Sequence, residues 1–90
     1  MKVRARILVS GKVQGVFFRQ SILLEAQSLE ITGWVRNLID GRVEAIFEGE
    51  EHEVKMLVNY CRQGPSAAKV TNLDVTYGRF KGEFSSFIVL

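Results

Sequence analysis

Cysteine, proline and long apolar runs are scarce in this 90-residue chain, and each absence excludes a class of protein. Cys61 is the only cysteine, so no disulfide framework can form within the chain, and an unpaired thiol favours the cytoplasm. No apolar run approaches the roughly 18 residues that a membrane-crossing helix needs, so no membrane association is expected. The opening MKVRARILVSGK has a broken apolar segment and no cleavage-site pattern, so no signal peptide is expected.

An excess of charge of one sign is also absent. Twelve Lys and Arg against ten Asp and Glu give a net charge of +2. Domains that bind nucleic acid usually carry a concentrated basic face, so no nucleic-acid partner is expected from this balance. The length and the 47% hydrophobic content predict one globular domain, residues 1–90, in which all elements share a single core.

The spacing of the apolar residues predicts a strand followed by a helix in the first third of the chain. Apolar and polar residues alternate from Val3 to Val9, which is typical of a half-buried strand. From Phe18 onward the spacing becomes three or four, which is typical of one face of a helix. The predicted stripe consists of Phe18, Ile22, Ala26 and Leu29.

The remainder of the chain predicts a hairpin, a second helix and two more strands. Asp40-Gly41, inside TGWVRNLIDGRVEAIFEG, tolerates the positive φ of a tight type I′ turn. The acidic run EEHE opens a second helix, which Gly64-Pro65 ends. Strands are predicted in KVTNLDVTYG and in SFIVL. The apolar stripe of the second helix consists of Val54, Leu57, Val58 and Cys61.

The predicted order is β-α-β-β-α-β with a further short C-terminal strand. This order defines an α+β, ferredoxin-like (split βαβ) sandwich, in which two helices cover one face of an antiparallel sheet. The architecture serves enzymes, RNA-binding modules and small-molecule sensors, so the function must come from a site.

The segment GKVQGVFFR, residues 11–19, lacks every residue type that usually caps a helix. A helix that begins near Phe17 or Phe18 has four backbone N–H groups without partners, and residues 12–18 contain no Ser, Thr, Asp or Asn to accept from them. Gly15 allows successive N–H groups to converge, and Arg19 can direct its guanidinium to the same point. These features predict a site for a phosphate-like anion; an ordinary glycine turn with a solvated arginine explains them about equally well.

Together with GWVRN, which ends at Asn37, this loop resembles the acylphosphatase family. The similarity continues through DGRVE, EG, CRQGP and GEF, and therefore covers nearly the whole chain. The resemblance implies the same ferredoxin-like fold. It implies hydrolysis of the carboxyl-phosphate anhydride of small acyl phosphates to carboxylate and inorganic phosphate, with no metal, cofactor or covalent phosphoenzyme. It also implies that these small molecules are the partners of a chain that we expect to be monomeric.

The resemblance assigns roles to individual residues. Arg19 and the loop amides are implied to bind the phosphate, and Asn37 is implied to orient the attacking water. Phosphoryl transfer through a loose transition state depends on positioning and charge stabilisation, which suits a site without a strong acid or nucleophile. We expect the proton of the water to pass to a substrate phosphate oxygen. The implied cradle consists of Gln14, Gly15, Val16, Phe17, Phe18 and Arg19.

Three positions depart from the family's usual pattern. Glu30 stands where the first helix commonly ends with glycine, and Ile39 stands where proline usually precedes the Asp-Gly turn. Gln20 follows the arginine at a variable position. None belongs to the implied cradle, so the departures concern the stability of the helix end and of the turn.

Several other residues have simpler structural roles, and two other functions are compatible with the fold. His52 is more simply a surface residue, Cys61 a core residue, and the acidic cluster around residue 50 a helix N-terminus. An RNA-recognition module would place its aromatics on central strands, whereas Phe17 and Phe18 lie at a helix start. A phosphate-sensing or carbamoyl-phosphate-handling domain with the same fold but no turnover is a further alternative. The acidic cluster consists of Glu48, Glu50, Glu51 and Glu53.

Overall fold

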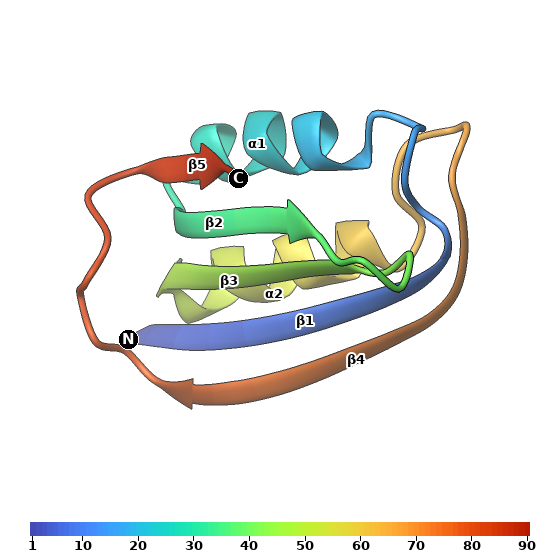
Figure 1. Ribbon diagram of the computed structural model, residues 1–90. Helices are drawn as coiled ribbons and strands as arrows, with labels where there is room; N and C mark the ends of the chain where they lie inside the picture. Colours follow the sequence, from blue (N-terminus) through green and yellow to red (C-terminus); the bar gives the residue numbers. More distant parts are fainter.

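Five strands and two helices follow one another in the computed structural model, which describes residues 1–90 (Figure 1). They are β1 (Lys2–Lys12), α1 (Phe18–Ser28), β2 (Thr32–Asn37), β3 (Val43–Glu50), α2 (Glu51–Cys61), β4 (Lys69–Arg79) and β5 (Phe87–Val89). The predicted order, including the short C-terminal strand, is confirmed. Neither helix is long and apolar enough to cross a membrane.

The five strands form one sheet in the order β4-β1-β3-β2-β5. The pairs β1–β3, β1–β4 and β2–β3 are antiparallel as expected, but β5 lies parallel to β2, so the whole sheet is mixed. The segment between β4 and β5 crosses one end of the sheet from edge to edge, as Figure 1 shows. Because β4 and β2 run in opposite directions, a chain that crosses at this end must enter β5 parallel to β2.

The core lies between the sheet and the two helices, which cover the same face (Figure 1). The alternation predicted for the first strand is confirmed, because Ala5, Ile7 and Val9 are fully buried there. The stripe of α2 is buried throughout, whereas the stripe of α1 is buried only as far as Ala26. Leu29 lies just beyond α1 and packs against the core from its margin.

Cys61 is a core residue, as the sequence predicted. Its side chain is completely buried in the cluster that joins α2 to the sheet. Burial raises the pKa of the Cys61 thiol far above its usual value, with a smaller contribution from the charge of Glu25. The thiol is therefore protonated and shielded from solvent, and packing is its role in this fold.

The outer face of the sheet carries two buried carboxylates. Glu44 accepts hydrogen bonds from Arg6 at 2.8 Å and from Arg36 at 2.7 Å. Glu48 accepts from Arg4 at 3.1 Å and from the backbone N–H groups of Lys81 and Gly82. These long arginine side chains cover the strand residues below them.

The assignment of Glu48 to a helix N-terminus was wrong. Glu48 lies inside β3, because the strand continues to Glu50 and α2 begins only at Glu51. Glu51 and Glu53 do occupy the first turn of α2, as expected. Sequence spacing alone could not separate a carboxylate on the strand from those on the helix that follows it.

The hairpin turn also differs from the expected two-residue type I′ turn. The Leu38 N–H donates to the Arg42 carbonyl at 2.8 Å, which closes a loop of three residues. Gly41 has φ 98°, and Asp40 accepts a hydrogen bond from the Arg42 N–H. A three-residue loop of this kind also places its glycine in the left-handed region, so Asp-Gly is compatible with both turns.

The departure at Glu30 has a clear structural consequence. Glu30 adopts φ 56°, the left-handed conformation that glycine would adopt without steric cost. The chain therefore ends α1 in the geometry expected of a glycine but with a side chain attached.

Candidate active site

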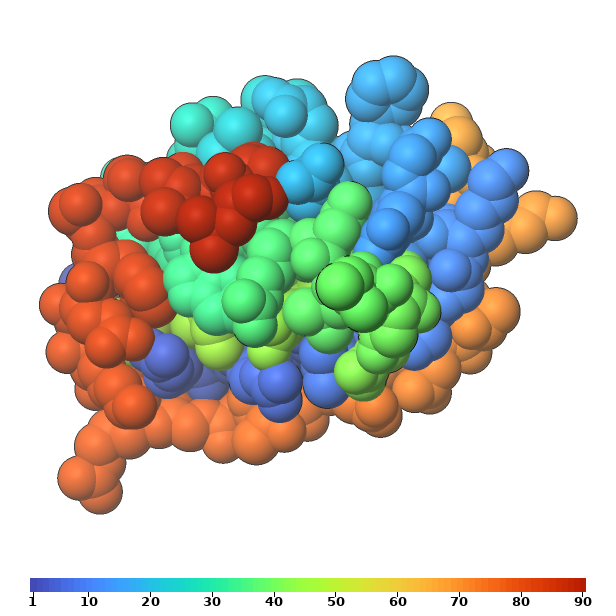
Figure 2. Space-filling view, viewed as in Figure 1, coloured from blue at the N-terminus to red at the C-terminus, as the bar shows by residue number.

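A cavity of about 270 Å³ lies where the start of α1, the end of β2 and the end of β5 meet. These three segments come together on the face that Figure 2 presents, in blue, green and red respectively. The cavity is lined by Val13, Gly15, Phe17, Phe18, Arg19, Gln20, Asn37 and Val89. The loop predicted to bind an anion and the predicted water-orienting residue thus face one space, although they lie about 20 positions apart in the sequence.

The backbone of the loop presents its donors without partners. Gly15 has φ 73°, and Phe17, the residue before α1, has φ 62° and ψ 24°. No backbone N–H from Val13 to Gln20 donates to another protein atom; the first that does is that of Ser21, to the Phe17 carbonyl at 3.0 Å. The helix has no side-chain cap, as predicted, and it has no acidic residue in its first turn. Left-handed residues bring neighbouring N–H groups together, and the helix dipole makes this point electropositive.

Arg19 lies in the first turn of α1 and lines the cavity. Its Nη1 donates to the carbonyl oxygen of Leu90 at 2.7 Å, so the residue after β5 anchors the guanidinium. The fork has five N–H donors, and this bond uses one of its groups. The remaining donors are free to bind two oxygens of an anion.

Asn37 is the last residue of β2, and its side chain has one atom without a partner. Asn37 Oδ1 is buried and accepts no hydrogen bond; it is the only buried side-chain polar atom of the molecule in this condition. An unpaired buried acceptor costs about 1–3 kcal/mol. Asn37 also lines the cavity, so its side chain lies beside any group bound there.

Gln14 belongs to the predicted cradle, but its side chain turns away from the cavity. Its Nε2 donates to the carbonyls of Leu38 at 2.7 Å and Arg42 at 3.0 Å. Gln14 therefore joins the loop to the turn that follows Asn37, and only its backbone remains available to an anion. The side chain of Val16 is buried and does not line the cavity either.

Phe18 fixes the start of α1 in the core. Its ring is almost completely buried, at 1% exposure, and it contacts Gly64 beyond the end of α2. A Cβ at Gly64 would lie 2.4 Å from Phe18 Cε2, and Gly64 itself has φ 71°. The glycine after α2 thus provides the space that the aromatic ring before Arg19 requires.

Charge in the cavity comes from one side chain. Arg19 is the only charged residue among those that line it, and no His, Cys, Asp or Glu is present there. His52 is exposed on α2, and no group of three or more His, Cys, Asp or Glu side chains in the molecule is arranged to hold a metal ion. The site is suited to binding an anion through oriented dipoles and one cation.

Three lining residues were missed at the level of sequence. Val89 enters the site through the parallel pairing of β5, which the sequence did not reveal. Val13 and Gln20 flank the cradle on either side and could have been included by their position alone. Leu90, which contacts Arg19, carried no signal in the sequence.

Comparison with known proteins gives one consistent family. The acylphosphatase family model matches residues 5–89. An acylphosphatase of Pelotomaculum thermopropionicum is 50% identical over 86 residues, which cover 96% of this chain and 94% of that protein. An acylphosphatase of Syntrophus aciditrophicus is 51% identical over 90 residues, which cover 100% and 94% respectively. The crystal structure of acylphosphatase from Bacillus subtilis superposes with a TM-score of 0.94 at 38% identity, covering 98% of each chain.

Proposed function

Because the chain belongs to the acylphosphatase family and is an acylphosphatase, we propose that it hydrolyses small acyl phosphates in the cavity at the start of α1. The reaction converts an acyl phosphate and water into a carboxylate and inorganic phosphate. The observation that carries the proposal is the meeting of unpartnered donors, an arginine and an unpartnered acceptor at one cavity.

The phosphate group binds to the loop backbone and to Arg19. The N–H groups of Gln14 to Arg19 supply oriented donors, and the guanidinium supplies a full positive charge. Negative charge accumulates on the equatorial oxygens during phosphoryl transfer, so donors fixed before the reaction stabilise the transition state without reorganisation. The bond from Arg19 to Leu90 and the bonds from Gln14 to the hairpin turn support this preorganisation.

Asn37 orients the attacking water. Its unpartnered Oδ1 accepts one hydrogen bond from the water, which leaves a lone pair of the water directed at phosphorus. An amide cannot take a proton at neutral pH, so Asn37 acts by positioning. No carboxylate or imidazole lines the cavity to act as a base instead.

The step balances without a further reactant. The water oxygen forms a bond to phosphorus while the bond between phosphorus and the acyl oxygen breaks. The carboxylate leaves with the bonding electrons and needs no proton. The water proton passes to a phosphate oxygen, so a substrate dianion yields a carboxylate and a phosphate monoanion.

The test measures phosphate release from acetyl phosphate with excess EDTA for the parent protein and for Asn37→Ala and Arg19→Ala. We expect turnover by the parent without metal and a loss of about 10²–10³ in kcat for each variant, which is typical when one oriented group is removed. Arg19→Ala should also lose competitive inhibition by inorganic phosphate. Leu24→Ala, an exposed change on α1 outside the cavity, is the matched control.

Three results would contradict the proposal in different ways. A parent that binds phosphate without turnover would be a binding domain with an enzyme's fold. If the parent neither turns over acetyl phosphate nor binds phosphate, the loop is an ordinary turn without a binding role. Turnover that survives both substitutions would place the chemistry elsewhere.

We propose further that residues 1–90 act as one domain, as a monomer, in the cytoplasm. The unpaired Cys61 supports a reducing compartment, and the mild net charge supports the absence of a nucleic-acid partner. Light scattering across a concentration series tests the monomer, and salt-dependent retention on immobilised RNA would contradict the absence of such a partner.

A further inference from the structure

We infer that Phe17 forms the wall against which the acyl group lies, so that the enzyme prefers acyl phosphates whose acyl group is apolar and uncharged. This inference rests on the proposed function, because it assumes that the phosphate occupies the cradle. It identifies the residue that contacts the acyl group, which the phosphate-binding residues do not determine.

The first observation is the exposure of Phe17. Its side chain is 83% exposed although it lines the cavity, whereas the other aromatic lining residue, Phe18, is buried in the core. Phe17 makes no aromatic or cation–π contact within the molecule. The ring is therefore the largest accessible apolar surface beside the cradle, and the fold does not use it for packing.

The second observation is the backbone conformation at the same residue. Phe17 has φ 62°, a region that bulky residues seldom adopt and that glycine adopts freely. The loop would reach this geometry more easily with a glycine. A large ring that is retained in an unfavourable conformation, without a packing partner, indicates a functional contact.

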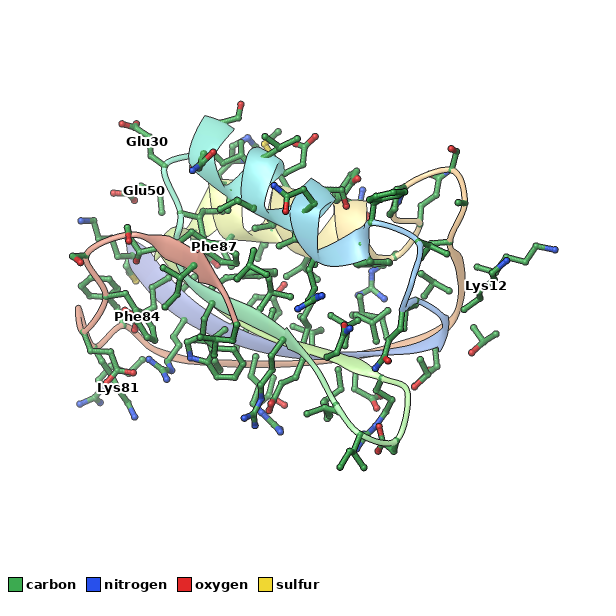
Figure 3. The ribbon with its side chains drawn as sticks, turned by 45° about the horizontal axis from the view of Figure 1, so that its top comes forward. Lys12, Glu30, Glu50, Lys81, Phe84 and Phe87 are labelled. Carbon is green, nitrogen blue, oxygen red and sulfur yellow. The ribbon has the colours of Figure 1, made fainter.

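The third observation concerns charge around the acyl side. Arg19 is the only charged residue that lines the cavity, and its guanidinium is committed to the phosphate and to Leu90. Lys12, the other cation in residues 11–19, points away from the molecule in Figure 3. An acyl group with a carboxylate, an ammonium or a second phosphate would therefore find no partner of opposite charge. Val89 adds a second apolar residue to the lining.

The first experiment compares the parent protein with Phe17→Ala on benzoyl phosphate and acetyl phosphate. Removal of the ring should raise the KM for benzoyl phosphate about tenfold and leave kcat within about twofold, because the contact forms equally in the ground and transition states. The parameters for acetyl phosphate should change much less than those for benzoyl phosphate, since its methyl group barely reaches the ring. Alanine retains the same backbone restriction, so the loop is not loosened.

Leu24→Ala serves as the matched control, because Leu24 is an exposed apolar residue of α1 that does not line the cavity. This variant should have the kinetic parameters of the parent protein for both substrates. An equal loss on benzoyl and acetyl phosphate in Phe17→Ala would mean that the cradle itself was disturbed and would overturn the inference. Unchanged benzoyl phosphate kinetics would overturn it as well.

A second comparison tests the charge of the acyl group in the parent protein. Butyryl and succinyl phosphate have chains of the same length, and only the latter ends in a carboxylate. We expect kcat/KM to be at least about tenfold lower for succinyl phosphate, because its charge loses water without gaining a partner. Equal values, or a preference for succinyl phosphate, would overturn the inferred specificity.

A binding measurement separates this inference from the proposed function. Phenylphosphonate and methylphosphonate are not hydrolysed, so their affinities are defined even for a protein without turnover. Phe17→Ala should weaken the binding of phenylphosphonate about tenfold and that of methylphosphonate much less. If the variant shows this pattern and the parent protein releases no phosphate from any acyl phosphate, hydrolysis is contradicted, but the contact between Phe17 and the acyl group is supported.

Discussion

The N-termini of the two helices share the absence of a side-chain cap and are opposite in chemistry. Each begins a helix of 11 residues, and neither has a side-chain cap. The first turn of α2 contains Glu51 and Glu53, and the Glu51 N–H donates to the Met1 carbonyl at 3.0 Å. The first turn of α1 contains no acid, and its free donors face a cavity beside Arg19.

This difference underlies the binding site that we propose at the start of α1. Both helices have a dipole of the same direction and N–H groups in the first turn that have no partner within the helix. In α2 the carboxylates of Glu51 and Glu53 complement the dipole, and the Met1 carbonyl accepts from the Glu51 N–H. The N–H groups at the start of α1 have no protein acceptor and are available to an anion. The absence of acids from the first turn of α1 is therefore as important to the site as the presence of Arg19.

The largest effect is expected from a change at Gly64, where the segment after α2 contacts Phe18 at the start of α1. Gly64→Ala should lower the free energy of unfolding by about 3 kcal/mol, since it combines positive φ with a clash against the ring of Phe18. The displaced ring should also move the loop and lower kcat/KM. Urea unfolding and acyl phosphate hydrolysis measure the two effects.

Gly41→Ala is the control for this prediction. Gly41 also has positive φ, at 98°, but a Cβ there would meet nothing within 4 Å. It should therefore show only the backbone cost, about 1 kcal/mol. Equal losses in the two variants would mean that the contact with Phe18 contributes nothing.

The second way is to give α1 the chemistry of α2. Gln20→Glu places a carboxylate in the first turn of α1, in the lining of the cavity. The new carboxylate and the substrate phosphate, about 6 Å apart, would repel by about 3 kcal/mol at an effective dielectric of 20. The value of kcat/KM should therefore fall about 100-fold. Stability should rise by about 0.3–1 kcal/mol, because the carboxylate favours the helix N-terminus.

The converse change belongs to α2. Glu53→Gln should lower stability by about 0.3–1 kcal/mol and leave kcat/KM within about twofold. If Gln20→Glu hydrolysed acyl phosphates as fast as the parent, the free N–H groups of α1 would not be the anion site.

The sequence carried the local features of both regions. Periodicity predicted α1, α2 and the burial of Cys61, and the missing capping residues before Phe18 correctly indicated unpaired donors. These are properties of neighbouring residues, which one stretch of sequence contains in full.

Long-range contacts were not predictable in the same way. The parallel pairing of β5, the bond from Arg19 to Leu90 and the direction of the Gln14 side chain all join residues more than 20 positions apart. The positive φ at Phe17 was also missed, because only the path of the whole loop requires it. Alternation could not indicate the burial of Glu48, since Arg4 of another strand and the backbone of Lys81 and Gly82 provide it.

Unlike the cradle, which has no carboxylate, the sheet contains Glu44 and Glu48, whose pKa values make its stability depend on pH. Burial alone would raise the pKa of Glu48, but hydrogen bonds from the Lys81 N–H and from Arg4 outweigh it and hold the pKa below its usual value. The pKa of Glu44 is lowered in the same way by Arg36 and Arg6 against the effect of burial. A lowered pKa contributes stability that is present above the unfolded pKa of about 4.3 and is lost as the pH falls through the folded value.

We therefore expect the urea midpoint to fall steadily below about pH 4.3, because protonation removes the interactions that stabilise the two native carboxylates. Glu48→Gln should make this fall shallower, because one titrating group is gone. A midpoint in the variant that fell as steeply as in the parent would show that acid stability is determined elsewhere.

The smallest effect concerns the other end of α1. Glu30→Gly should raise the free energy of unfolding by about 0.5–1 kcal/mol, because glycine adopts the observed φ of 56° without strain. Glu25→Gly, in the exposed middle of the same helix, should instead lower it by about 1 kcal/mol. Thermal unfolding of the two variants sharpens the contrast, and a loss of stability at Glu30 would contradict it.

The most direct test of the central claim compares the two helix starts in one titration. Backbone amide resonances are followed by NMR while inorganic phosphate is added to the parent protein and to Arg19→Ala. We predict saturable shifts for the amides of residues 14–20 and the side-chain amide of Asn37, no shift for residues 51–54, and loss of the response in Arg19→Ala. Equal responses at the two helix starts, or none at residues 14–20, would contradict the account.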